Sequence, residues 1–217
     1  MRKTVHYIFI LMFVLITSST SRGQSPLRLG LQSGLNIANQ SWPSSSSRLG
    51  VSAAAIIEYR ISSLIYLQGE TRYIQKGSEI GGQVITDETG PEPIGEGTSH
   101  FNFDNLEFPV LLKVIFNSGK IKPYFLLGPN LAINISSKTT FTTRIFETGE
   151  TNEVFSADID DADSIELAFE IGGGGELQLS NNVSIGVTIR YLKGLNTVWR
   201  DSKSRGLLIT VGTLFRI

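Results

Sequence analysis

The feature that most constrains this sequence is a repeated alternation of apolar and polar residues, which predicts half-buried β-strands. In the first such segment Leu29 and Leu31 share one predicted face, and Arg28 and Gln32 share the other. Eight segments follow the rule: 27–37, 51–60, 65–76, 105–116, 122–135, 165–176, 183–191 and 206–217. Because no later segment has the period of an amphipathic helix, the sequence predicts an all-β fold with eight strands.

The predicted connections alternate in length. The short ones, near 60–63, 117–120 and 180–182, are rich in Asn, Gly and Ser, which tolerate hairpin dihedrals. The longer ones are residues 38–47, 78–99, 137–163 and 197–205. An even number of strands, with short turns at one end and long loops at the other, predicts an antiparallel up-and-down barrel of the transmembrane type.

Alternation alone does not say which face of the barrel points outward. In a soluble barrel the apolar face points inward, whereas in a membrane barrel it meets lipid. The predicted strands reach the roughly 9–11 residues that a tilted strand needs to cross a bilayer, and the polar face carries charges of both signs. We therefore expect a transmembrane barrel whose interior holds a structural charge network: Arg28, Glu58, Arg60, Glu70, Arg72, Glu107, Lys113, Glu170, Glu176, Arg190 and Arg216. The alternative is a soluble lipocalin-like barrel that carries a small apolar ligand.

Residues 1–23 have the pattern of a signal peptide. Arg2 and Lys3 precede an apolar run of about ten residues, which is too short to anchor the chain in a bilayer. Ser21 and Gly23 are small residues suited to cleavage before Gln24. We expect an exported protein with a barrel domain at residues 24–217; an uncleaved anchor or a buried helix is the alternative.

Composition excludes several function classes. The 217 residues include 19 Lys and Arg against 20 Asp and Glu, so no basic excess favours a nucleic-acid partner. Cysteine is absent, which removes disulfides, thiolate metal sites and cysteine nucleophiles. His100 lies near Ser99 and Asp104, but neighbours on a strand face opposite ways and do not converge. We predict no catalytic, cofactor or metal residues and a non-enzymatic protein.

A four-glycine run at residues 172–175 interrupts one predicted strand. It lacks the Lys-Ser/Thr that completes a phosphate-binding loop, so it predicts a bend or a close approach of strands.

The loops 78–99 and 137–163 hold 12 of the 20 acidic residues. The segment Asp158–Asp163 has the carboxylates for calcium but not the spacing of an EF-hand, so a solvated acidic loop is the favoured interpretation. We expect the two loops to contact envelope proteins, and the barrel to contact outer-membrane lipid and lipopolysaccharide. Closure of a barrel leaves no free strand edge, which is consistent with a monomer.

Several segments, in this order along the chain, resemble the PorT-like outer-membrane β-barrel family of Bacteroidota: Gly30–Asn36, Glu70–Tyr73, Leu106–Lys113, Lys122–Tyr124, Gly172–Glu176 and Arg190–Leu195. The resemblance spans nearly the whole chain after residue 23. It implies an eight-stranded barrel in the outer membrane and no catalytic residues.

Overall fold

The computed structural model describes residues 26–41, 45–86, 93–116, 119–159, 165–197 and 202–217. The predicted signal peptide and its cleavage site lie outside these residues. The described chain forms nine strands: β1 Leu27–Gln40, β2 Ser46–Arg60, β3 Ile65–Thr86, β4 Pro93–Ile115, β5 Ile121–Ile145, β6 Thr151–Asp158, β7 Ile165–Gln178, β8 Val183–Gly194 and β9 Ser204–Arg216.

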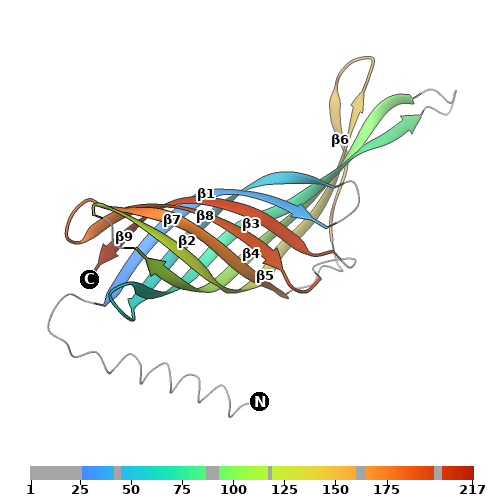
Figure 1. Ribbon diagram of the computed structural model, residues 1–217. Coiled ribbons are helices and arrows are strands. Elements are labelled where there is room, and N and C mark those ends of the chain that lie inside the picture. Colours follow the sequence, from blue (N-terminus) through green and yellow to red (C-terminus); the bar gives the residue numbers. More distant parts are fainter. Residues whose placement is uncertain (1–25, 42–44, 87–92, 117–118, 160–164, 198–201) are drawn as a thin grey trace, which may run out of the picture.

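Eight of these strands close into a ring (Figure 1). The order around it is β1-β2-β3-β4-β5-β7-β8-β9, and β9 pairs with β1 from Arg28↔Arg216 to Gln40↔Ser204. All pairings in the ring are antiparallel. The predicted eight-stranded antiparallel up-and-down barrel is therefore confirmed.

The two faces of the ring have opposite character. Outward side chains are apolar and exposed, as at Leu31 (65%), Val51 (50%) and Val211 (53%). Inward side chains are polar or charged and buried, as at Arg72 and Glu107. Since a soluble protein rarely exposes so much contiguous apolar surface, this arrangement is that of a membrane barrel and opposite to that of a lipocalin. Within the described residues, no helix is long and apolar enough to cross a membrane.

Three strands continue beyond the ring and form a projecting sheet with β6. This sheet comprises residues 78–86, 93–104, 136–145 and 151–158, in the order β3-β4-β5-β6, and we call it the arm. It projects from the end of the barrel opposite the C-terminus (Figure 1).

The arm corrects the prediction that 78–99 and 137–163 are loops. Most of their described residues are paired strand, from Ser78↔Phe101 to Thr86↔Pro93 in one hairpin and from Lys138↔Asp158 to Arg144↔Thr151 in the other. The sequence here lacks a regular apolar alternation because neither face of the arm is required to contact lipid.

Candidate functional site

The interior of the barrel holds a charged cluster next to the short turns. We call it the mouth cluster: Arg28, Glu58, Lys113 and Glu176. Arg28 binds Glu58, and its Nη1 lies 2.6 Å from Glu176 Oε1. Lys113 Nζ lies 2.7 Å from Glu58 Oε1 and 3.3 Å from Glu176 Oε2. Two cations thus balance two carboxylates, and all four residues are buried.

Tyrosine rings support both cations of the mouth cluster. The Arg28 guanidinium carbon lies 4.5 Å from the centre of the Tyr66 ring, and Lys113 Nζ lies 4.2 Å from that of Tyr124. A Cβ added at Gly174 would lie only 2.6 Å from Tyr124 Oη. The glycine run therefore makes room for a ring inside the barrel, as expected for a close approach rather than a phosphate loop.

A second group of charges fills the middle of the barrel and continues toward the arm. We call it the central network: Glu70, Arg72, Lys76, Glu107, Glu166, Glu170 and Arg190.

Arg72 is the hub of this network. It contacts three carboxylates: Glu107, with Nη2 2.5 Å from Oε2; Glu70, with Nη1 3.3 Å from Oε2; and Glu170. Arg190 Nη1 lies 2.9 Å from Glu70 Oε1 and 3.2 Å from Glu170 Oε2. Each arginine therefore joins carboxylates from different strands, as a guanidinium with five donors is suited to do.

Lys76 extends the network by one layer. Its Nζ lies 2.7 Å from Glu107 Oε1 and 2.8 Å from Glu166 Oε2. Glu166 also accepts a hydrogen bond from the Ser204 hydroxyl.

Three contacts of the central network cross the lumen, one of them between Arg190 on β8 and Glu70 on β3. Arg72 and Lys76 lie on β3, whereas Glu170 and Glu166 lie on β7, and these strands are not neighbours in the ring. Four members, Arg72, Glu107, Glu170 and Arg190, have no exposed surface. Side chains therefore close the barrel at this layer, as expected for eight strands.

Nine of the eleven predicted interior charges lie in the two clusters: Arg28, Glu58, Glu70, Arg72, Glu107, Lys113, Glu170, Glu176 and Arg190. The other two, Arg60 and Arg216, are half-buried and line a cavity at the short-turn end. Sequence reasoning omitted Lys76 and Glu166, although each lies four residues from a predicted member of the network on the same polar face. Both lie within the predicted strands 65–76 and 165–176, so the same alternation places them on the polar face.

His100 lies on the arm. Its Nδ1 is 3.2 Å from Glu79 Oε1, and its Nε2 is 3.1 Å from Thr142 Oγ1. Ser99 is adjacent on β4 and points to the opposite face. The described residues therefore do not bring Ser99 and His100 together as a catalytic pair.

The calcium candidate is described only at its first residues. Asp158 ends β6 and stands opposite Lys138, while Asp160, Asp161 and Asp163 lie outside the described residues. Among the residues that the structure describes, no group of three or more His, Asp or Glu side chains is placed to hold a metal ion.

Comparison with known proteins agrees with this geometry. Residues 17–200 match the family of the outer membrane protein beta-barrel domain. No curated protein matches the sequence. Among solved structures, Neisserial surface protein A (NspA) is 16% identical with a TM-score of 0.51, and the match covers 90% of this chain and all of that one.

Two further solved structures are more distant. Ail, the attachment invasion locus protein of Yersinia pestis, is 12% identical over 88% of this chain and 100% of its own, with a TM-score of 0.37. The N-terminal barrel domain of OprF from Pseudomonas aeruginosa is 13% identical over 85% and 97%, with a TM-score of 0.36.

A closed ring with an apolar exterior and a charged interior defines an outer-membrane β-barrel protein. The chain belongs to the outer membrane protein beta-barrel domain family, and its location is the outer membrane. The family match ends at residue 200, before β9, which completes the ring by pairing with both β8 and β1.

Proposed function

We propose that this is a non-enzymatic outer-membrane protein whose arm binds a protein partner outside the cell. In bacterial barrels the short turns face the periplasm and the longer connections face outward. The β2–β3, β4–β5 and β7–β8 connections lie at one end of the ring and the arm extends from the other, so the arm is extracellular.

The observation that carries this proposal is the unpaired edge of β6. The strand pairs with β5, and its other edge faces no described strand. Val154 (61%) and Phe155 (56%) on β6 are exposed. An open strand edge can add an extended segment of another protein by main-chain hydrogen bonds.

The charge of the arm indicates which partner fits. Glu150, Glu153 and Asp158 are exposed on or next to β6. Two copies of this edge would bring like charges near one another, which disfavours self-pairing. The proposed partner therefore presents an extended segment with basic residues. The ring itself has no free edge, so we propose a monomeric barrel embedded in outer-membrane lipid and lipopolysaccharide.

The motifs from Gly30–Asn36 to Arg190–Leu195 occur in the same order as in one branch of this family, and they support a more specific family assignment. We assign the chain to the PorT-like branch of the family, in the Bacteroidota.

Photo-crosslinking in intact cells tests the role of the arm. A photoreactive phenylalanine analogue in place of Phe155 should give a discrete adduct of higher mass. The matched position is Phe215, which is similarly exposed (47%) but lies on the outward face of the barrel. Adducts that are absent, or the same from both positions, would contradict the proposal.

A deletion tests the same proposal independently. Removing residues 141–160 takes away β6 and the end of β5. It should abolish co-purification of the protein that the Phe155 adduct identifies. Heat-modifiable gel mobility shows whether the shortened protein still forms a barrel. If the partner still co-purifies with it, β6 has no role in binding.

A further inference from the structure

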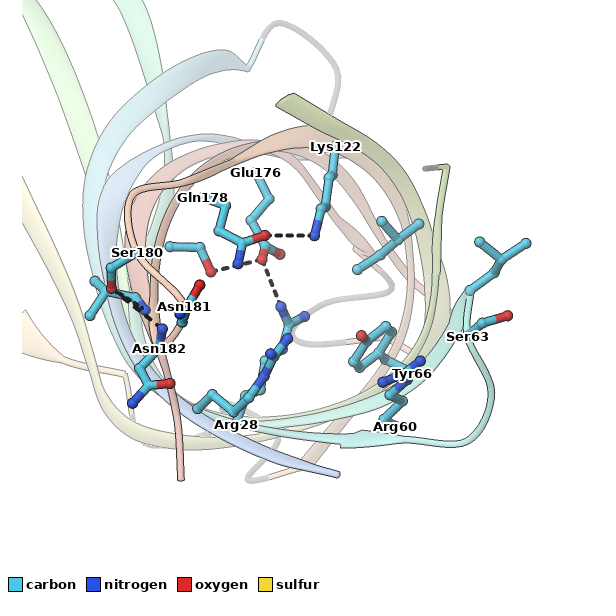
Figure 2. A pocket seen from close by; sticks show the side chains of 15 residues that line it. Arg28, Arg60, Ser63, Tyr66, Lys122, Glu176, Gln178, Ser180, Asn181 and Asn182 are labelled. Atoms are coloured by element: carbon cyan, nitrogen blue, oxygen red, sulfur yellow. Dashed lines mark hydrogen bonds and ion pairs between the residues drawn. The ribbon is translucent and has the colours of Figure 1, made fainter. Parts of the chain in front are cut away.

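The short-turn end of the barrel opens into a cavity of about 350 Å³ (Figure 2). Four cations from four strands line it: Arg28 on β1, Arg60 on β2, Lys122 on β5 and Arg216 on β9. Among the described residues that line it, Glu176 is the only acid.

The carboxylate of Glu176 already has hydrogen-bond partners within the protein. It accepts hydrogen bonds from Arg28 (2.6 Å), from Ser184 (2.8 Å) and from Lys113 (3.3 Å). Within the mouth cluster the charges of Arg28 and Lys113 balance those of Glu58 and Glu176. The charges of Arg60 and Lys122 are additional to this balance.

The known contacts of two rim cations are to neutral atoms. Lys122 Nζ donates to Gln178 Oε1 at 2.9 Å, as Figure 2 shows, and Arg60 Nε donates to the carbonyl oxygen of Ser62 at 3.1 Å. These bonds orient the two side chains without neutralising them.

The strand register places a further cation beside Arg28. Arg28 and Arg216 are directly opposed partners on β1 and β9. In addition, Arg28 Nε is buried and has no hydrogen-bond partner among the described residues. An anion in the cavity would add a hydrogen-bond acceptor among these donors.

We propose that this cavity binds a phosphate group. Guanidinium forks match the oxygens of phosphate. A phosphate monoester also carries about 1.5 to 2 negative charges at pH 7, more than one carboxylate, whereas the phosphodiester of a lipid headgroup carries one. The side chains of Gln178 and Asn182 line the same cavity and add polar hydrogen-bonding groups. The phosphate belongs either to a small soluble molecule of the periplasm or to the headgroup of a lipid.

Isothermal titration of the purified full-length protein tests the proposal, in a maltoside detergent that contains no phosphate. Inorganic phosphate should bind at one site per barrel, at least about tenfold more tightly than acetate, because charge-assisted hydrogen bonds are stronger with the doubly charged anion. Arg60→Ala and Lys122→Ala should each weaken phosphate binding by about fivefold or more. Lys120→Ala is the matched control, since it removes an exposed cation at the same end that does not line the cavity, and it should leave binding unchanged.

Nanodiscs distinguish the two sources of phosphate. If a lipid headgroup occupies the site, phosphate binding seen in detergent should disappear in discs that contain phosphatidylglycerol. If the ligand is a small soluble phosphate compound, binding should persist there. Absence of binding in detergent, or an equal loss in Lys120→Ala, would overturn the proposal; heat-modifiable mobility shows that each variant is folded.

Discussion

Lys76 on β3 reaches Glu166 on β7 across the lumen, with 2.8 Å between Nζ and Oε2. One layer nearer the short turns, Arg72 reaches Glu170 between the same two strands. The two contacts tie opposite walls of the barrel together at two heights. Because desolvation of ion pairs is costly, such contacts are stable only when every member is satisfied.

Loss of Arg72 should be strongly destabilising. Arg72→Met leaves the carboxylates of Glu70, Glu107 and Glu170 buried without their shared cation. Removal of one partner from a buried ion pair costs about 3–5 kcal/mol. Urea unfolding of the protein in lipid vesicles measures this free energy. The control is Arg205→Met, which removes an exposed arginine of β9; equal effects of the two substitutions would contradict a structural role for the network.

Lys76 and Glu166 should be energetically coupled. A double-mutant cycle with Lys76→Met and Glu166→Gln should give a coupling energy of about 0.5–3 kcal/mol, the range for residues in one network. The reference cycle uses Lys138 and Asp158, which are opposed and exposed on the arm. That pair should give about 0–1 kcal/mol. A coupling for the interior pair no larger than that of the reference would show that the contact across the lumen contributes little.

A charged residue on the outward face should destabilise the protein where that face contacts lipid. Val211 lies at the middle of β9 opposite Ser33 and Val187, and Val154 lies on the arm. Both valines are more than half exposed. Val211→Arg should lower the free energy of unfolding by about 2–4 kcal/mol, because charge at the bilayer midplane is costly. Val154→Arg should change it by less than about 0.5 kcal/mol. The reverse order would mean that the assigned membrane position is wrong.

The closed layer of the central network should block ion flow. Arg72, Glu107, Glu170 and Arg190 leave no exposed surface in the middle of the lumen. Purified protein in a planar lipid bilayer should therefore give no unitary conductance steps, whereas a porin added as a positive control should give them. Reproducible conductance steps from the unmodified protein would contradict this prediction, because they would show that the lumen opens.

The sequence predicted most of the barrel because lipid imposes strict alternation. Leu29, Leu31 and Leu35 face outward and Arg28 faces inward, as their spacing indicates. The arm was not predicted. Outside the bilayer neither face of a strand contacts lipid. Residues 78–86 therefore show no alternation of apolar and polar residues, even though they form a paired strand.

The interior contacts were predictable as a set of residues but not as pairs. The polar face identified Arg72 and Glu170 as interior residues. Only the closure of the ring brings these two side chains, 98 positions apart in the sequence, into contact across the lumen. Lys76 and Glu166 lie in predicted strands on the same polar face, so alternation was sufficient to include them in the set. Arg60 and Arg216 share the polar face but lie where the barrel opens, so alternation alone did not separate them from the buried charges.

Heat-modifiable gel mobility of the protein in the outer-membrane fraction tests the central claim most directly. A closed transmembrane barrel keeps its fold in detergent without boiling, so unboiled and boiled samples should run at different positions, and the protein should be found with the outer membrane. A single mobility before and after boiling, with the protein in the soluble periplasmic fraction, would contradict the account.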